Sequence, residues 1–283
     1  MNLLKKSISI ILSICMIFTF ISGSAIAQST NNSNSNQEVH VTERFKLRPV
    51  QIDNDKIVVK GEYEGDEAYA TIDLKTDIVT MQTIEYKKNT VANAIGSLLG
   101  KDNKSVKNYE VKIHQVEQEE KGTKLVATLT DKESKKEIKI DNTKVKAQAP
   151  IVAGLAGVLG EALIGYLTRI AAVTAAGLVI AGSISETLKE KSPNYYEAHI
   201  DFALNNVLIG NPIDEATAKN RASGGQDVWS KNQIIAFQLA SNFGSPVGPE
   251  IHGRGAAGYY NHYHPRWAMV MEDGRGKAHL FFG

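Results

Sequence analysis

The chain has 283 residues, a length that favours two domains at about 100–200 residues each. Its 32 Lys and Arg residues balance 31 Asp and Glu residues, and the formal net charge of +1 excludes a globally basic nucleic-acid coat protein and an acidic solvating protein. The single cysteine, Cys15, excludes an internal disulfide and a cysteine-based zinc site. Four of the seven histidines lie in the last 32 residues, which makes the C-terminus the first place to look for chemistry.

The N-terminus has the pattern of an export signal. Lys5 and Lys6 precede the apolar stretch Ile8–Ile21, and the small residues Ala25-Ile26-Ala27 follow as a cleavage site. The apolar stretch is shorter than the roughly 20 residues that span a membrane, which disfavours an uncleaved anchor. We therefore expect a secretory signal peptide over 1–27, a polar linker over 28–36, and a secreted protein that is extracellular or associated with the cell wall.

Residues 37–149 have the alternation of antiparallel β-strands. Charged and apolar residues alternate along the segment, and turn residues separate the runs, as expected of strands with one solvated face. The interpretation is a β-rich domain with one short helix. The expected strands are Lys56–Lys60, Ala68–Leu74, Ile78–Tyr86, Tyr109–Gln118, Lys124–Thr130 and Glu137–Ile140, and the expected helix is Thr90–Leu99.

A Gly- and Ala-rich apolar segment follows over residues 150–191. Between Ile151 and Ile184 it carries only two charged residues, Glu161 and Arg169. Small residues allow helices to approach closely, both in membranes and in soluble hairpins. Three interpretations remain open: a buried helical hairpin, a segment that makes transient contact with a membrane, and a permanent anchor.

Residues 192–283 predict a C-terminal α+β domain with helices followed by a small antiparallel sheet. The chain as a whole is therefore expected to be α+β. Stop signals and apolar periodicity place the helices, and Asp273-Gly274 is a good hairpin turn between the last two strands. The expected helices are Glu197–Leu208, Asp214–Arg221 and Lys231–Asn242, and the expected strands are Tyr259–His264, Trp267–Met271 and Lys277–Phe282.

The C-terminal histidines are the candidate catalytic residues. His262 and His264 are two apart, so on a strand both imidazoles point to the same face. His279 lies on the last expected strand, and His252 follows Glu250 in the preceding loop. Two histidines near neutral pKa can act as acid and base in RNA cleavage without a cofactor, with a cation to neutralise the phosphate.

Four further residues are predicted to bind substrate. They are Arg254, Arg266, Lys277 and Tyr260. Two alternatives stay open for the histidines: a divalent metal held by His-x-His together with a third histidine or Glu250, and hydrogen-bonding residues packed among aromatic rings.

Three C-terminal motifs carry a resemblance to a known family. They are Val247-Gly-Pro-Glu-Ile-His252, Gly258-Tyr-Tyr-Asn-His-Tyr-His-Pro265 and Ala278-His-Leu-Phe-Phe-Gly283. They resemble the tail of polymorphic-toxin cargo domains, and the whole chain resembles a family of secreted toxins of Gram-positive bacteria. Helices followed by short strands also resemble the barnase-like superfamily of small toxin ribonucleases, in architecture only. The resemblance implies a toxin and an immunity protein as its partner.

Two functions from different classes follow. The first is a secreted antibacterial toxin whose C-terminal domain is a nuclease that cleaves RNA by histidine acid–base catalysis, without a required metal. The second is a non-enzymatic, membrane-active or adhesive secreted protein that acts through residues 151–184.

Overall fold

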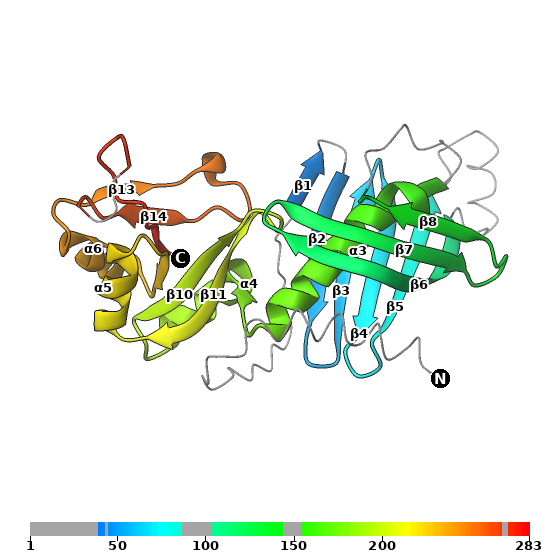
Figure 1. The fold of residues 1–283 in the computed structure, drawn as a ribbon, viewed down its shortest axis with the longest axis horizontal. Coiled ribbons are helices and arrows are strands. Elements are labelled where there is room, and N and C mark those ends of the chain that lie inside the picture. Colours follow the sequence, from blue (N-terminus) through cyan, green and yellow to red (C-terminus); the bar gives the residue numbers. More distant parts are fainter. Residues whose placement is uncertain (1–38, 43–44, 87–103, 144–153, 268–270) are drawn as a thin grey trace, which may run out of the picture. The chain divides into compact units, whose positions relative to one another are not determined.

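The computed structural model describes residues 39–42, 45–86, 104–143, 154–267 and 271–283 (Figure 1). Contacts divide these residues into two compact units, the first ending at Ala171 and the second beginning at Ala172. Both units contain strands and helical residues, which confirms the α+β class. The predicted signal peptide, the linker, Cys15 and the predicted helix Thr90–Leu99 lie outside the described residues.

The first unit contains an eight-stranded antiparallel sheet whose strands follow one another in chain order. All six strands expected from the alternation are present, and two N-terminal strands are added to them. The sequence pattern does not reveal β2, since Pro49 interrupts the alternation. The pairing of β2 with β3 is irregular at the same point. The strands are β1 (Val39–Thr42), β2 (Phe45–Ile52), β3 (Lys56–Tyr63), β4 (Asp66–Asp73), β5 (Ile78–Tyr86), β6 (Lys104–Glu119), β7 (Gly122–Asp131) and β8 (Glu137–Asp141).

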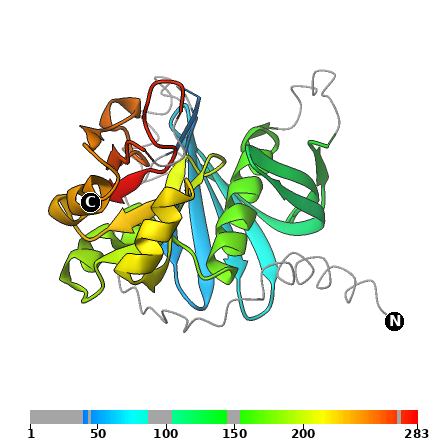
Figure 2. The same ribbon diagram turned by 60° about the vertical axis from the view of Figure 1, so that its left-hand side comes forward.

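Helix α3 (Gly154–Ala175) packs along the inner side of this sheet, which curls around it (Figures 1 and 2). Its side chains Leu159, Leu163 and Leu167 are fully buried. Gly160 lets the helix backbone approach the sheet, because a Cβ atom there would lie 3.1 Å from Ile140 Cδ1 and 3.2 Å from Leu129 Cδ2. The small residues of the apolar segment therefore serve close helix–sheet packing.

The two apolar helices do not pack against each other as the expected hairpin would, but belong to different units. α3 packs through Ala171 with the first unit, whereas α4 (Ala181–Glu190) belongs to the core of the second. Leu155–Ala175 is long and apolar enough to cross a membrane, but 61% of its most apolar 18-residue window is buried. Packing against the sheet accounts for this composition.

The second unit is built on a seven-stranded sheet in the order β13-β14-β15-β12-β10-β11-β9. The sheet is mixed, because β12 and β15 pair in parallel, and three of its strands precede the helices α5 and α6. The expected order of helices and then an antiparallel sheet is therefore wrong. The strands are β9 (Val179–Ile180), β10 (Tyr195–Asp201), β11 (Asn206–Ile213), β12 (Val228–Ser230), β13 (Val247–Glu250), β14 (Asn261–His264) and β15 (Leu280–Phe282).

Two hydrophobic cores cover the two faces of this sheet. Side chains alternate between them along each strand, so that Tyr195 and Phe282 pack with α5 (Glu215–Ser223) and α6 (Gln233–Ser241), while their neighbours Tyr196 and Phe281 pack with α4. The expected helices Asp214–Arg221 and Lys231–Asn242 are confirmed as α5 and α6. Each begins with a side chain, Asp214 or Asn232, that accepts a hydrogen bond from a backbone amide of the first turn.

The predicted helix Glu197–Leu208 is wrong, because this segment forms the hairpin of β10 and β11. The turn is fixed by the Asp201 carboxylate, which accepts a hydrogen bond from the Leu204 amide at 2.9 Å, and by Asn205, whose φ is +47°. The register of the hairpin shifts between Tyr196 and Ala198. That bulge breaks the period-two spacing and leaves a pattern that a helix also fits.

We predict that Gly160→Leu lowers the free energy of unfolding of the first unit by about 2 kcal/mol, because the added side chain must enter a filled helix–sheet contact. Val158→Leu, at a position on the same helix that is 56% exposed, is the control and should change it by less than about 0.5 kcal/mol. Urea unfolding followed by far-ultraviolet circular dichroism measures both. Equal stability of the two variants would contradict the described packing of α3.

Candidate functional site

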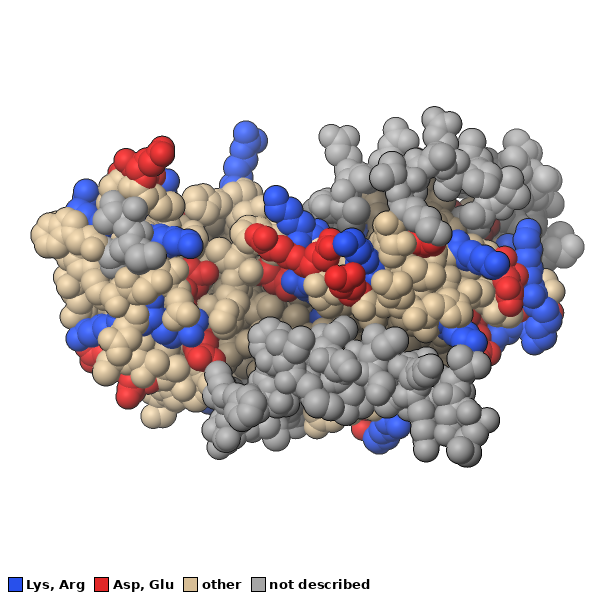
Figure 3. All heavy atoms as spheres, viewed as in Figure 1, with Lys and Arg blue, Asp and Glu red and all other residues tan. Residues whose placement is uncertain are grey.

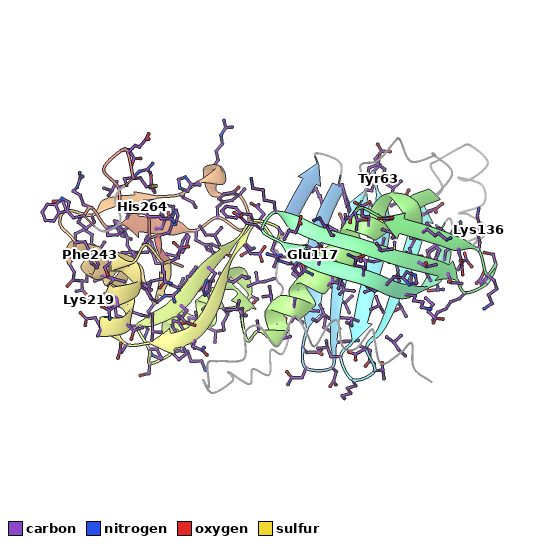
Figure 4. The ribbon with its side chains drawn as sticks, in the orientation of Figure 1. Tyr63, Glu117, Lys136, Lys219, Phe243 and His264 are labelled. Carbon is purple, nitrogen blue, oxygen red and sulfur yellow. The ribbon has the colours of Figure 1, made fainter. Side chains whose placement is uncertain are left out.

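The site is assembled on strand β14, which carries two histidines on one face. His262 and His264 alternate with Tyr263, whose ring packs on the opposite face in the core with α6. β14 lies between β13 and β15, and His262 is paired with Phe281 on one side and with Glu250 on the other. Figure 4 labels His264 in this sheet.

His279 and His252 complete a cluster of four imidazoles. His279 immediately precedes β15 and stacks on Phe281, with ring centroids 5.4 Å apart. Its ring lies 4.7 Å from that of His264, and the ring of His252 lies 4.9 Å from that of His262. One ring nitrogen from each of the four residues lies within 4.8 Å of the others. The structure therefore brings together all four histidines that the sequence singled out.

The four imidazoles differ in burial. His262 and His264 are each only 1% exposed, His279 is partly buried, and His252 is exposed. Gly258 helps to set this arrangement, because its φ of +88° lets the loop before β14 pass against Asn205, where a Cβ atom would lie 2.0 Å from the carbonyl oxygen. Two histidines are thus sealed inside and one stands at the surface.

Hydrogen bonds fix the tautomers of three histidines. The Nδ1–H group of His262 donates to the Tyr260 carbonyl at 3.0 Å, that of His264 to the Gly276 carbonyl at 2.9 Å, and that of His279 to Asp227 Oδ1 at 2.9 Å. Each neutral ring therefore carries its lone pair on Nε2. The Nε2 atoms of His262 and His264 are buried and have no hydrogen-bond partner among the described residues.

Asp227 is a site residue that the sequence did not reveal. Its Oδ1 also accepts the backbone N–H of His279 at 2.8 Å, and its carbonyl accepts from Arg221 Nη2 at 3.2 Å. Arg221 lies on α5, so the helix holds the loop that orients His279. The motif Gly224-Gly225-Gln226-Asp227 predicted only a loop, and no local signal connects it with a histidine 52 residues away.

Glu250 and Arg275 form the charged edge of the site. Glu250 Oε1 lies 3.0 Å from His264 Nε2, 3.7 Å from His262 Nε2 and 2.7 Å from Arg275 Nη1. Arg275 also pairs with Asp273, at 2.6 Å between Nη2 and Oδ2. The sequence pointed to Glu250 as an alternative metal ligand but not to Arg275, which lies in a turn that predicted only a reversal of the chain.

The environment changes the protonation of these groups. Burial lowers the pKa of the His262 imidazole to about 4, and burial likewise lowers the pKa of His264 below its ordinary value. Burial raises the pKa of the Glu250 carboxyl, but the hydrogen bond and the charge of Arg275, together with the nearby histidines, outweigh this effect, and the pKa lies below its ordinary value. Near neutral pH the site therefore presents two neutral imidazoles and an ionised carboxylate.

The four predicted substrate-binding residues are not all gathered at the cluster. Arg254, Arg266 and Lys277 are exposed, and Arg266 Nε donates to the Ser245 carbonyl at 3.2 Å. The Tyr260 hydroxyl donates to Asn206 Oδ1 at 3.3 Å, and its ring packs on Trp229. Tyr260 contacts the cluster through its backbone carbonyl, which accepts the hydrogen bond from His262. On the face that Figure 3 shows, the charged side chains of the second unit are scattered and of both signs.

Residues 268–270 of the predicted strand Trp267–Met271 lie outside the described residues, and neither Trp267 nor Met271 lies in a strand. The Asp273-Gly274 turn is present, with the Gly274 amide donating to the Met271 carbonyl at 3.0 Å. It connects β14 to β15, which pair directly with each other.

The histidine cluster can hold a metal ion. Imidazole nitrogens are common ligands of divalent transition metals, and histidine ligands usually donate their other N–H to a carbonyl or carboxylate. His262, His264 and His279 follow this pattern. Comparison with protein families, with curated proteins and with solved structures finds no match to this chain.

We predict that the metal-free second unit loses stability as the pH falls from 6.5 toward 4. Folding lowers the pKa of His262 from 6.5 to about 4, so in this range the unfolded chain binds more protons than the folded one. The loss of stability is negligible above pH 6.5 and grows to about 3 kcal/mol at pH 4.

Urea unfolding in a chelator, followed by tryptophan fluorescence, measures this loss, because both Trp229 and Trp267 lie in the second unit. His262→Leu should flatten the pH dependence, and His114→Gln, on the exposed part of β6, should not. An unchanged slope in His262→Leu would show that His262 is not the titrating group.

Proposed function

We propose that the second unit is a metal-dependent phosphodiesterase that cleaves RNA, and that the chain is a secreted antibacterial toxin. One observation carries the proposal: the Nε2 atoms of His262 and His264 are buried and without a partner of hydrogen-bond geometry among the described residues, and one ring nitrogen from each of the two rings lies within 4.8 Å of those of His279 and His252. Buried polar atoms are rarely left without a partner except at functional sites.

The protonation of the site favours a metal over catalysis by histidines alone. Acid–base cleavage needs one imidazole that is protonated near neutral pH. With its pKa lowered to about 4 by burial, His262 is neutral there, and its Nδ1–H is committed to a backbone carbonyl. A neutral imidazole with a fixed inward lone pair is the form that binds a metal. We therefore propose a metal-dependent mechanism in place of the metal-free mechanism expected from the sequence.

The remaining histidine is suited to moving protons. His252 is exposed, and its ring lies 4.9 Å from that of His262. A bound divalent ion lowers the pKa of a coordinated water and neutralises charge on the phosphoryl oxygens. In the proposed step, water gives a proton to His252 while its oxygen bonds to phosphorus. The phosphorus–oxygen ester bond breaks, and the leaving oxygen takes the proton from His252.

The nucleic-acid substrate is supported by the exposed cations Arg254, Arg266 and Lys277 on the segments that carry the histidines. The toxin assignment is supported by the secretion signal predicted over 1–27 and by the three C-terminal motifs that resemble toxin cargo domains. A nuclease of this kind also requires an immunity protein as a partner in the producing cell. The alternative of a membrane-active protein gains no support from α3, most of whose large apolar side chains are buried.

We predict that the chain from Gln28 onward degrades RNA in the presence of Mn²⁺, Co²⁺ or Zn²⁺ and loses this activity in a chelator. His264→Ala should lower the rate at least about 100-fold, because it removes a ligand with a fixed lone pair. RNA integrity on gels and the hydrolysis rate of a chromogenic phosphodiester measure the activity. Residues 192–283 alone are not a suitable fragment, because they lack β9 and α4, which belong to the second unit.

The matched control is His114→Ala, a histidine of the first unit that bonds to Thr128. It should retain full activity, and tryptophan fluorescence should show that His264→Ala is folded. Activity that persists in the chelator and is lost in His264→Ala would restore the metal-free mechanism. Absence of phosphodiester hydrolysis with every metal would overturn the proposed function.

A further inference from the structure

We propose that Glu250 is a metal ligand of this site, beside His262, His264 and His279, and that Arg275 is the residue that positions its carboxylate. The inference rests on the proposed function in one respect, which is that the histidine cluster binds a divalent transition metal. It goes further by assigning the coordination sphere, and with it the chemical class of the metal.

The position of Glu250 fits a ligand. It lies on β13, directly opposite His262 in the antiparallel pair. Its Oε1 atom is 3.0 Å from His264 Nε2 and 3.7 Å from His262 Nε2. Donor atoms bound to one metal at about 2.0–2.2 Å lie roughly 3–3.6 Å from one another, as tetrahedral and octahedral angles require. The distance from Glu250 to His264 lies within this range and the distance to His262 is 0.1 Å beyond it, so a small adjustment would bring the carboxylate into the coordination shell of an ion held by both rings.

The chemistry of the three atoms favours a cation among them. Because the Nδ1 atoms of His262 and His264 hold the ring protons, lone pairs on both Nε2 atoms face the ionised Glu250 carboxylate. Neither Nε2 atom has a partner with hydrogen-bond geometry in the described part of the chain, although Glu250 Oε1 lies 3.0 Å from His264 Nε2. Electron-rich atoms at this distance repel one another in a buried site, and a divalent cation among them reverses the sign of that interaction.

Arg275 fixes the carboxylate from the outside. Its Nη1 atom lies 2.7 Å from Glu250 Oε1, and its Nε atom donates to Asp273 Oδ2 at 2.6 Å. The next residue, Gly276, supplies the carbonyl that orients His264. One short loop therefore positions two of the proposed ligands, and Arg275 acts through Glu250 rather than on the substrate.

The ligand set defines the class of metal. Three imidazoles and one carboxylate give a mixed nitrogen and oxygen shell, which suits Mn²⁺, Fe²⁺, Co²⁺, Ni²⁺ or Zn²⁺ and disfavours Ca²⁺, Mg²⁺ and Cu⁺. The four residues would hold the ion, and the ion would supply an activated water and neutralise charge on a phosphoryl oxygen. His252 is then free to transfer protons, in agreement with its exposure.

Co²⁺ binding to the chain from Gln28 onward, stripped with a chelator and dialysed, tests the assignment. Isothermal titration calorimetry gives the affinity, and the visible absorption of Co²⁺ reports its ligands. Glu250→Gln keeps the size of the side chain but removes its charge. We expect one Co²⁺ per chain in the wild type, an affinity at least tenfold lower in Glu250→Gln, and a changed absorption spectrum.

Glu272→Gln is the matched control, since Glu272 is an exposed carboxylate on the same loop as Arg275. It should leave the affinity and the spectrum unchanged. Arg275→Gln should weaken binding and shift the spectrum, and Arg275→Lys should restore part of both, as expected of a positioning residue. If Glu250→Gln is unfolded by tryptophan fluorescence, Glu250→Asp replaces it, with an affinity between those of the wild type and a chain without a carboxylate.

The outcomes separate this inference from the proposed function. Wild-type Co²⁺ affinity and spectrum in a folded Glu250 variant would overturn the assignment of Glu250 while leaving metal-dependent hydrolysis intact. Co²⁺ binding that depends on Glu250, in a chain that hydrolyses no phosphodiester, would support the assignment and overturn the proposed function. A wild-type chain that binds no Co²⁺ would overturn both.

Discussion

Burial of two imidazoles on one strand is the constraint on which the second unit depends. His262 and His264 are almost inaccessible to solvent, and a buried imidazole is tolerated only when its N–H finds an acceptor. The carbonyls of Tyr260 and Gly276 meet this requirement. Because those bonds occupy Nδ1 in both rings, Nε2 is left to face the interior. The same two hydrogen bonds therefore satisfy the buried N–H groups and direct both Nε2 atoms toward the histidine cluster.

The parts of the chain that surround these rings come from well-separated segments. β13 brings Glu250 across from His262, the loop before β15 brings Arg275 and Gly276, and Asp227 reaches His279 from the loop after α5. Each segment contributes a polar group whose partner lies in another segment. Such a cluster is rigid because its side chains are held by backbone pairing and by hydrogen bonds, not by side-chain packing alone.

In the first unit the constraint is the burial of one face of the sheet. A sheet of alternating charged and apolar residues has one face that must be covered, and α3 covers it with leucines and with glycines that permit close approach. A helix so rich in glycine has little stability of its own, since each glycine costs roughly 1 kcal/mol in a helix interior. Its apolar character belongs to this contact. The two units therefore bury their apolar surfaces in different ways, and the histidine cluster lies in the second.

Local patterns in the sequence alone determined the strands β3–β8 of the first unit, the two helices α5 and α6, and the common face of His262 and His264, because these features depend on local spacing. Tertiary structure alone decided that residues 197–208 form a hairpin, since a bulge hides the strand period. It also decided that Asp227 and Arg275 belong to the site, because their partners lie 52 and 25 residues away along the chain. Local spacing shows which way a side chain points, but only the pairing of distant strands shows what it meets.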